Sequence, residues 1–565
     1  MECKMGAHLA AQALVEQGID TIFTLSGGHI TPIYQFLENS GIKLYDTRHE
    51  QAAVFMAEAY GRMTRKPGVA MVTAGPGFTN ALSAVANANM ANSPLVLISG
   101  CVGLECIEKL DLQDIRQAPV IEPMVKKAFV CHRPERVAEF VDMAFRTAIS
   151  GRPGPVYLEL PVDVLNCKLD GVTPRRFKTD IESRPVDLEK AREIMKMIEA
   201  AEKPIIIAGS GTWYADAGED LVKFVEATGI PTFTSAAGRG TIPDTHPLCF
   251  ESSLAIRPGG SMLANMSTDL VIILGSRISL YYIFGDIFPT TAKMVQVDIK
   301  PEELGRNRAI DLPVVSDVKG LLMELNRLVA ESNASASLTG RFAPWVEAVK
   351  QADIAGKADA KQHWESDSVP IHPLRVSWEI NQFMNRDDDI VIADGGDTQI
   401  WMGMTRTVRR PGKYMDSGLY GCLGVGLPYA NAAKYLNPDS RVCLSIGDGS
   451  TGFNFMEFET SIRKGLPIVV VISNDLGWGM IRHSQTIRMG HAIPDGTWIG
   501  KVDYHKMVEA IGGKGMFVDK GADIRPALEE AFASGKTTCI NVMVDPETIS
   551  PGSVALANLG GYKAE

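Results

Sequence analysis

Two polar residues with the chemistry of metal ligands follow apolar runs that we expect to be neighbouring parallel strands. Gly447–Asp448–Gly449 comes directly after the run Val442–Ile446, and Asn474 comes shortly after the run Ile468–Ile472. The 24 residues between Gly449 and Asn474 suit one crossover helix. Both side chains would then meet at the carboxyl edge of the sheet, where open α/β sheets bind their ligands.

Carboxylate and amide oxygens are hard donors that suit Mg²⁺, which binds one or two carboxylates and completes its shell with phosphate oxygens and water. No soft ligand is near, which argues against zinc. Glycines on both sides of Asp448 let the backbone approach a ligand, and the helix that follows presents its N-terminal amides to an anion. The sequence therefore predicts a magnesium site here; an ordinary Gly-Asp-Gly turn is the alternative.

The elements that would position this site follow an α/β pattern. Short apolar runs alternate with helical patterns along the chain, which indicates mainly parallel sheets. Two stretches poor in such runs, about 166–186 and 332–370, are predicted to be linkers. They divide the chain into three domains and a tail, at 1–166, 187–332, 370–545 and 546–565.

A weak internal repeat relates the first and third domains. The strand Val69–Thr73 meets Gly75–Pro76–Gly77, and the following strand is preceded by Pro94. In the third domain Gly449 and Pro467 take the corresponding places; the glycine-to-proline spacing is 17 residues in one copy and 18 in the other. Any two strand–helix–strand units can look alike, but the repeat favours two related sheet domains around a distinct middle one.

The composition excludes several classes of protein. A net charge of −11 argues against a nucleic-acid or anionic-membrane surface. The nine cysteines include no C-x-x-C pair, so no zinc or redox motif is indicated, and scattered thiols fit a reducing compartment. No signal sequence precedes the first helix, and no apolar run reaches the roughly 18–20 residues of a membrane span. We expect a cytoplasmic protein.

The motif Gly447–Asp448–Gly449, with Asn474 at this spacing, resembles the signature of thiamine-diphosphate enzymes. The resemblance, closest to the acetolactate synthase large subunit and its relatives, runs over nearly the whole chain. It implies two related parallel-sheet domains that bind the pyrimidine and the diphosphate of the cofactor, flanking a Rossmann-like middle domain. It also implies that Asp448, Asn474 and the carbonyl of Leu476 hold Mg²⁺, which bridges the diphosphate. Pro76 stands where Asp448 falls in the repeat, so the first domain should bind no metal.

A glutamate lies at the junction of the predicted strand Lys43–Thr47 and the predicted helix Gln51–Arg62, in the run Arg48–His49–Glu50. The helix dipole alone favours an acid at this place. The resemblance implies that Glu50 is the activating glutamate, which shares a proton with the aminopyrimidine so that the cofactor can carry carbanion chemistry. In the family this glutamate comes from the partner subunit, which implies at least a homodimer, with a homotetramer as the favoured assembly.

A histidine in the glycine-rich run Ser26–Gly27–Gly28–His29 follows the predicted strand Thr21–Leu25. Such a histidine often caps a turn, but at neutral pH it can also move a substrate hydroxyl proton, and benzaldehyde lyases, which this segment resembles, carry a working histidine there. The resemblance further implies that Gln113 faces the reacting centre. It implies cofactor contacts from Thr73, Gly75, Asn80, Gly396, Asp397, Thr398, Gly421, Leu423, Gly447, Gly449, Ser450, Gly477 and Trp478, with Leu423 bending the cofactor and Asp397 contributing backbone amides.

Three departures from the biosynthetic acetolactate synthases bear on the substrate. Ser484 replaces the tryptophan that shapes their second-substrate pocket, which argues against a committed branched-chain role. Gly275–Tyr281 departs from their flavin-contacting run, which argues against FAD. Gly209–Ser210–Gly211 opens the middle domain, but Tyr214 occupies the third glycine position of a dinucleotide fingerprint. An ADP or CoA-like nucleotide, or no ligand, is therefore expected in the middle domain.

Four runs resemble the 2-hydroxyacyl-CoA lyases: Gly27–Ile30, Asp46–Glu50, Asn474–Trp478 and Asp503–Lys506. This implies cleavage of a 2-hydroxyacyl-CoA to an aldehyde or ketone and formyl-CoA, reversible as a carboligation. An acetolactate-synthase or benzaldehyde-lyase activity on free 2-oxo or 2-hydroxy compounds is one alternative; a catalytically silent binding or assembly subunit is another. The expected partner is a small molecule, with an acyl-CoA as a candidate, and neither nucleic acid nor membrane. For the tail, which contains Ser550–Ser553, an active-site lid and a frayed terminus are the alternatives.

Overall fold

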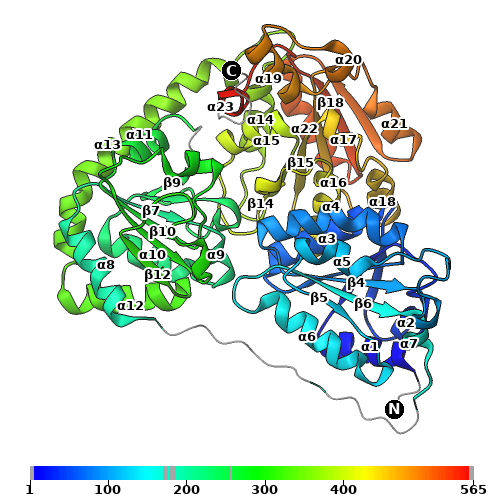
Figure 1. Ribbon diagram of the computed structural model, residues 1–565. Helices are drawn as coiled ribbons and strands as arrows, with labels where there is room; N and C mark the ends of the chain where they lie inside the picture. Colours follow the sequence, from blue (N-terminus) through cyan, green and yellow to red (C-terminus); the bar gives the residue numbers. More distant parts are fainter. Residues whose placement is uncertain (1–4, 170–175, 177–185, 255–256, 559–565) are drawn as a thin grey trace. The chain divides into compact units, whose positions relative to one another are not determined.

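Three six-stranded sheets, parallel throughout, organise the chain in the computed structural model (Figure 1). The structure describes residues 5–169, 176, 186–254 and 257–558. Contacts divide the chain into two units, one of residues 1–181, 417–439 and 452–467 and the other of the remaining residues. The α/β fold class predicted from the alternating runs is confirmed, because all three sheets have the strand–helix alternation and parallel pairing it requires.

The first sheet has the strand order β2-β1-β3-β4-β6-β5. Its strands are β1 (Thr21–Thr24), β2 (Lys43–Asp46), β3 (Gly68–Val72), β4 (Leu95–Cys101), β5 (Ala128–Val130) and β6 (Pro155–Pro161). The helices in its part of the sequence are α1 (Gly6–Glu16), α2 (Thr31–Leu37), α3 (Glu50–Thr64), α4 (Pro76–Ala91), α5 (Gln117–Ile121), α6 (Val137–Ile149) and α7 (Val162–Asn166).

The third sheet repeats this order, as β14-β13-β15-β16-β18-β17. Its strands are β13 (Ile390–Asp394), β14 (Tyr414–Met415), β15 (Val442–Gly447), β16 (Val469–Asn474), β17 (Lys514–Val518) and β18 (Thr538–Met543). Numbered within each sheet, both orders are 2-1-3-4-6-5, so the two sheets share one topology, as the repeat predicted. The helices in this part of the sequence are α14 (Pro373–Phe383), α15 (Gly396–Thr405), α16 (Gly426–Leu436), α17 (Asp448–Thr451), α18 (Glu457–Arg463), α19 (Gly479–Met489), α20 (Pro494–Thr497), α21 (Tyr504–Ala510), α22 (Ile524–Ala533) and α23 (Pro551–Asn558).

The middle sheet differs, with the order β12-β11-β10-β7-β8-β9. This is the 3-2-1-4-5-6 order of the Rossmann fold read from its other edge. Its strands are β7 (Pro204–Ala208), β8 (Thr232–Thr234), β9 (Cys249–Ser252), β10 (Leu270–Leu274), β11 (Lys293–Asp298) and β12 (Leu312–Val315). Its helices are α8 (Leu188–Ala200), α9 (Ser210–Tyr214), α10 (Gly218–Thr228), α11 (Gly260–Ser267), α12 (Val318–Ser332) and α13 (Ser335–Trp364).

The stretch 332–370, predicted to be a linker, is mostly the 30-residue helix α13. Leu338, Phe342, Trp345 and Val349 are buried and recur every three or four residues, so they form one apolar face. Trp345 also donates a hydrogen bond from Nε1 to the carbonyl of Pro204, at 3.1 Å. Because the rest of the helix is polar and Ala-rich, this narrow stripe was not recognised in the sequence. The other predicted linker, 166–186, lies largely outside the described residues.

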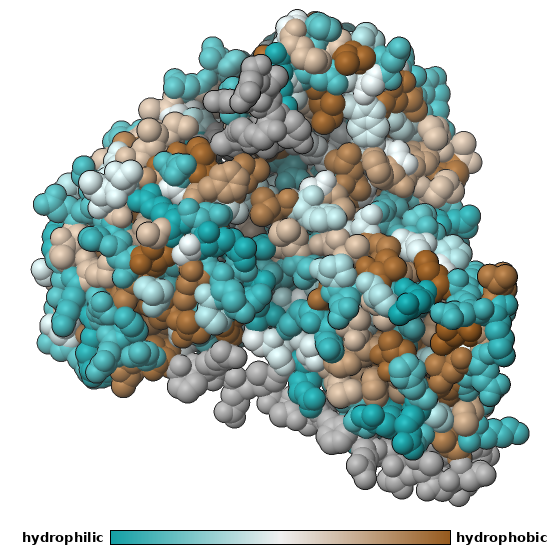
Figure 2. All heavy atoms as spheres, in the orientation of Figure 1, coloured by the Kyte–Doolittle hydropathy of each residue, from teal (hydrophilic) through white to brown (hydrophobic). Residues whose placement is uncertain are grey.

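Hydrophobic residues are interspersed with hydrophilic ones on the face of the molecule that Figure 2 shows. Within the described ranges, no helix is both long and apolar enough to cross a membrane.

Candidate functional site

The carboxyl edge of the third sheet brings three predicted loops together. The chain order reverses between β13 and β15, which makes the loops after these strands the expected ligand site. A Cβ on Gly395 would lie 2.9 Å from Oγ of Ser450, and one on Gly449 would lie 2.7 Å from the Trp478 ring. The loops following β13, β15 and β16 therefore meet, and glycine is required where they touch.

Asp448 and Asn474 lie at adjacent strand ends, because Gly447 of β15 pairs with Ser473 of β16. Asp448 is 2% exposed, and its Oδ2 has no hydrogen-bond partner within the described part of the chain. Burial, together with the neighbouring carboxyl of Asp475, raises the pKa of Asp448 to about 8. An unsatisfied, buried carboxyl of this kind is stabilised by a cation, so the site fits Mg²⁺.

The amide of Asn474 is oriented by its neighbours. Its Nδ2 donates to Oδ1 of Asn541 at 3.1 Å, and its Oδ1 accepts the backbone N–H of Leu476 at 3.1 Å. One lone pair of that oxygen remains for a metal. The described residues contain no group of three or more His, Cys, Asp or Glu side chains that could hold a metal ion.

The carbonyl of Leu476, the third predicted metal ligand, accepts two backbone hydrogen bonds in this structure. It accepts the backbone N–H groups of Ile499, at 2.9 Å, and Gly500, at 3.1 Å. Leu476 has φ +66°, a conformation that a leucine adopts only under local constraint. Since a carbonyl has two lone pairs, both are occupied here. The third protein ligand of the metal stays a prediction.

Asp397, in the first turn of α15, contacts the C-terminal tail. It accepts hydrogen bonds from the hydroxyls of Ser550 and Ser553, the latter at 2.6 Å. Its Oδ2 lies 2.9 Å from Nδ1 of His483, whose Nε2 lies 2.9 Å from the carbonyl of Pro546. We call these five residues the Asp397 cluster. The described part of the tail is thus bound at this edge, and its residues Pro551–Asn558 form α23. Whether the tail acts as an active-site lid stays a prediction.

Both ring nitrogens of His483 face groups that can only accept a hydrogen bond, so the geometry requires a doubly protonated, cationic imidazole. Burial lowers the pKa of His483, but the hydrogen bonds to Asp397 and Pro546 and the Asp397 charge outweigh it, and the pKa stands above its ordinary value. The charge of Asp397, unexpected beside a predicted diphosphate, is therefore paired with a cation. The sequence singled out the tail with Ser550 and Ser553 but not their contact with Asp397, and it did not single out His483; the unexplained acid in the loop was the only signal for that contact.

The first sheet has an equivalent edge, where its order reverses between β1 and β3. His29 follows β1, and its Nδ1 lies 3.2 Å from Oγ1 of Thr73, which follows β3. Glu50 is buried at the start of α3, and its Oε2 accepts a hydrogen bond from Nδ2 of Asn80 at 3.0 Å. A Cβ on Gly77 would lie 2.8 Å from Thr73 and 3.5 Å from Glu50. The structure thus groups four of the predicted site residues.

Gln113 and Gly75 also lie together. Gly75 has φ +56°, and a Cβ there would lie 2.7 Å from Cβ of Gln113. The N–H of Gly75 donates to Oε1 of Gln117 at 2.9 Å, and Nε2 of Gln117 donates to Tyr157 and to the carbonyl of Gly100, both at 3.0 Å. Gln117, which we missed, therefore orients the Gly75 turn. No local motif distinguishes it in the sequence.

Gly421 and Leu423 belong to the unit of the first sheet. The carbonyl of Gly424 beside them accepts a hydrogen bond from Nδ2 of Asn454 at 2.8 Å, and the same nitrogen donates to Oε1 of Gln51 at 3.1 Å. The predicted cofactor-bending segment is therefore connected to the residue that follows Glu50.

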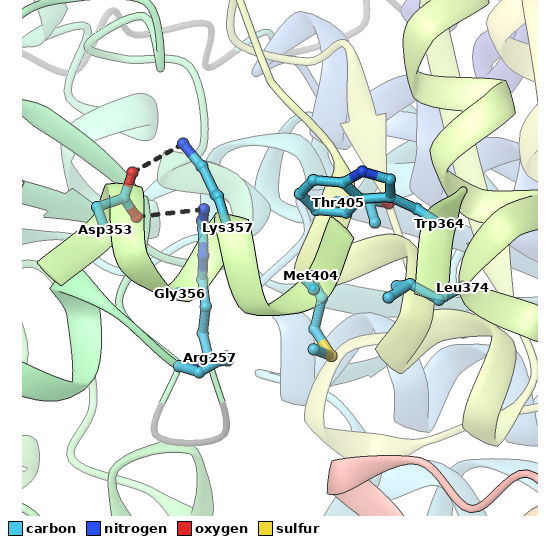
Figure 3. Close-up of a pocket in the computed structure, with 10 residues that line it drawn as sticks. Arg257, Asp353, Gly356, Lys357, Trp364, Leu374, Met404 and Thr405 are labelled. Carbon is cyan, nitrogen blue, oxygen red and sulfur yellow. Dashed lines mark ion pairs between the residues drawn. The ribbon is translucent and has the colours of Figure 1, made fainter. Parts of the chain in front are cut away.

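In the middle sheet the chain order reverses between β7 and β10, and the loops that follow these two strands pack closely. A Cβ on Gly211 would lie 2.6 Å from Cα of Gly275, so the two loops pack on each other and the glycines serve this contact. A cavity of about 30 Å³ is lined by Arg257, Lys357 and Trp364, and Figure 3 shows these side chains around it. Asp353 pairs with Lys357 at 2.8 Å and with Arg257 at 3.9 Å. This cavity holds about one water molecule, and its charges are paired.

Three family models match the chain, all for the thiamine pyrophosphate (thiamine diphosphate) enzymes. The N-terminal binding domain matches residues 4–120, the central domain residues 191–325 and the C-terminal binding domain residues 394–542. The chain belongs to this family. The two matched binding domains support thiamine diphosphate as the cofactor of this enzyme.

Relatives of this thiamine pyrophosphate enzyme carry different activities in their names. An acetolactate synthase large subunit of Mycobacterium tuberculosis is 34% identical, with 97% of each chain covered. A 2-hydroxyacyl-CoA lyase of Arabidopsis thaliana is 30% identical, with 96% of each chain covered. An oxalyl-CoA decarboxylase of Escherichia coli is 29% identical, with 96% of this chain and 95% of that protein covered. Similarity to both synthases and lyases establishes the family and leaves the reaction to be argued from the site.

Proposed function

We propose that this enzyme is a Mg²⁺-dependent carbon–carbon lyase of the 2-hydroxyacyl-CoA type, which releases an aldehyde or ketone and formyl-CoA and runs in reverse as a carboligase. The observation that carries the proposal is the position of His29, hydrogen-bonded to Thr73 in the same cluster as Glu50. A 2-hydroxy substrate must lose its hydroxyl proton when the carbon–carbon bond breaks. A base is therefore needed beside the reacting centre.

The chain's own groups have distinct roles in this proposal. Asp448 and Asn474 would hold the metal ion, and Glu50, held by Asn80, would exchange a proton with the aminopyrimidine of the cofactor. When bound, thiamine diphosphate would supply a nucleophilic carbon and a ring that stabilises the carbanion left by bond cleavage. Burial lowers the pKa of His29, although the charge of Asp111 opposes the shift. This shift favours the neutral imidazole, the form that can accept the substrate hydroxyl proton.

The proposal is tested by incubating enzyme, Mg²⁺ and thiamine diphosphate with formyl-CoA and an aldehyde, and measuring 2-hydroxyacyl-CoA by mass spectrometry. Removing a positioned acid or base costs roughly 10²–10⁴-fold in rate, so we expect losses of this size in Glu50→Gln and in His29→Phe. The matched control Glu38→Gln changes an exposed glutamate and should retain activity. Absence of any 2-hydroxyacyl-CoA product from the unaltered enzyme would refute the proposal.

A synthase activity on free 2-oxo acids is the second candidate, and similarity to the Mycobacterium tuberculosis acetolactate synthase subunit favours it. Acetolactate formed from pyruvate alone would identify it. A silent assembly subunit is disfavoured because Glu50, Asp448 and Asn474 are all in place. Mass spectrometry of ligands retained on purification would show whether an ADP or CoA-like nucleotide accompanies the cofactor.

We also propose that the enzyme is at least a homodimer, with a homotetramer favoured. An exposed apolar segment in the unit of the first sheet supports this, since Leu110 is 97% exposed and Leu112 is 76% exposed. Both lie within the three residues that precede the predicted site residue Gln113. Light scattering after size-exclusion chromatography measures the assembly, and a monomer at micromolar concentration would contradict it.

A further inference from the structure

The turn that carries Glu50 is held by a segment far away in sequence. The backbone N–H of Arg48 donates to Oε1 of Glu457, at the start of α18, at 2.9 Å. On the other side of Glu50, Oε1 of Gln51 accepts a hydrogen bond from Nδ2 of Asn454 at 3.1 Å. Arg48 and Gln51, on either side of Glu50, are thus both bound by the segment 454–457, which belongs to the same unit.

Glu457 is an unusual residue to find in this place. It is 1% exposed, and a buried carboxyl is costly unless it is hydrogen-bonded. Burial raises the pKa of Glu457 to about 7. The hydroxyl of Thr460, the N–H of Arg48 and the charge of Arg463 act in the opposite direction, because they favour the ionised form. Its bond to the Arg48 N–H is the contact that would be lost if an apolar side chain of the same size took its place.

At the strand side of the turn, the N–H of Thr47 donates to the carbonyl of Thr24 in β1 at 3.0 Å. The other hydrogen bonds around Arg48–Gln51, apart from those of Glu457 and Asn454, are local. Thr47 donates from Oγ1 to the carbonyl of His49 at 2.8 Å, and Nδ1 of His49 accepts the N–H of Gln51 at 3.1 Å. These bonds shape the turn but do not fix it relative to the rest of the unit. Asn80 holds only the far end of the Glu50 side chain. A displacement of about 1 Å in a catalytic group can reduce the rate about 10²-fold.

We propose that Glu457 is a positioning residue for Glu50: by accepting the N–H of Arg48, and with Asn454 bound to Gln51, it sets the direction in which the Glu50 carboxyl leaves the start of α3. This inference rests on the proposed role of Glu50. It adds a residue that touches neither cofactor nor substrate.

Three substitutions separate this role from a role in packing. Glu457→Gln keeps an Oε1 that can accept the Arg48 N–H, whereas Glu457→Ala removes it and Glu457→Asp withdraws it by one methylene while keeping the charge. Glu459→Gln is the matched control on the same helix, because Glu459 approaches the Arg48 side chain, at 3.9 Å, and not its amide. If Glu457→Ala does not fold, Glu457→Asp decides the test.

The first measurement needs no cofactor. Hydrogen–deuterium exchange of the Arg48–Gln51 amides, followed by mass spectrometry, should be at least tenfold faster in Glu457→Ala and Glu457→Asp than in the unaltered protein. Exchange in Glu457→Gln and Glu459→Gln should stay within about threefold. A residue needed only for packing would lower the melting temperature without this selective change.

The second measurement is the exchange of the thiazolium C2 proton of bound thiamine diphosphate for deuterium, read by NMR after acid quenching. We expect a loss of tenfold or more in Glu457→Ala and Glu457→Asp, and retention in Glu457→Gln. Unchanged amide and C2 exchange in the Ala and Asp variants, or an equal loss in Glu457→Gln, would overturn the inference. Unchanged C2 exchange in Glu50→Gln would instead overturn the proposed role of Glu50, so the two failures are distinguishable.

Discussion

The Asp397 cluster should control how firmly the C-terminal tail is held. Asp397 accepts two hydroxyl hydrogen bonds from the tail, and His483 and Arg482 both bind the carbonyl of Pro546, Arg482 at 2.7 Å. The substitution Asp397→Asn keeps the shape of the side chain and removes its charge. The hydroxyl bonds become neutral, and the ion pair with His483 is lost.

The magnitude follows from the number of bonds affected. A hydrogen bond to a charged group contributes about 1.5–3 kcal/mol and one between neutral groups about 0.5–1.5 kcal/mol. Weakening the two hydroxyl bonds should therefore lower the free energy of tail opening by about 2 kcal/mol in total. Since 1.4 kcal/mol is a factor of ten, tail opening should become roughly thirty times more frequent.

Hydrogen–deuterium exchange of amides in residues 546–558 measures this opening directly. Asp503→Asn is the matched control, because Asp503 pairs only with exposed Lys506 on the same domain and has no contact with the tail in the described structure. If tail amides in Asp397→Asn exchange as slowly as in the control, the cluster does not hold the tail and the reasoning is refuted.

The same cluster should respond to pH through His483. Its pKa is raised in the folded state, so the stabilisation it provides is complete below the ordinary histidine pKa of about 6.5 and is lost as pH rises through the higher folded value. Tail protection, corrected for intrinsic exchange rates, should therefore fall as pH rises above about 6.5. A His483→Gln variant should show weaker protection that no longer varies over this range; a persisting pH dependence would assign it to another group.

Three further predictions concern the sites and the fold. Asp448→Asn should abolish the stabilisation by Mg²⁺ and thiamine diphosphate, about 2.7 kcal/mol at a hundredfold excess over Kd, in thermal melts; the ligand-free variant should be no less stable, because burial and the neighbouring Asp475 carboxyl raise the pKa of Asp448 and so disfavour its charged form. Gly100→Ala should cost about 1–3 kcal/mol in urea unfolding, because the new Cβ would lie 2.5 Å from Cβ of His29, whereas Gly28→Ala meets nothing within 4 Å and serves as its control. Trp345→Ala should lower the free energy of unfolding by about 3–5 kcal/mol. A loss below about 1 kcal/mol would show that α13 is not part of the hydrophobic core of the middle domain.

Much of the fold could be predicted because it depends on local patterns. Strand runs such as Val442–Ile446 are apolar and short, and the order of strands and helices alone favours parallel sheets. The proximity of Asp448 and Asn474 was predictable for the same reason, since a short crossover places consecutive parallel strands side by side. The crossover contains two short helices, α17 and α18, in place of the single helix predicted. The helix α13 was not, because its apolar stripe is narrow and is diluted by alanine and charged residues.

Within each unit, the site is completed by contacts between segments that the sequence does not relate. Arg48 and Glu457 are 409 positions apart, and Asp397 and Ser550 are 153 apart. The residue types along the chain were enough to propose a metal site, an activating glutamate and a histidine base, because those roles require particular functional groups. Which carboxyl is left without a hydrogen-bond partner at the sheet edge, which contacts the tail and which accepts the N–H of a turn was decided by tertiary structure, because these contacts depend on the donors and charges that folding places around each carboxyl.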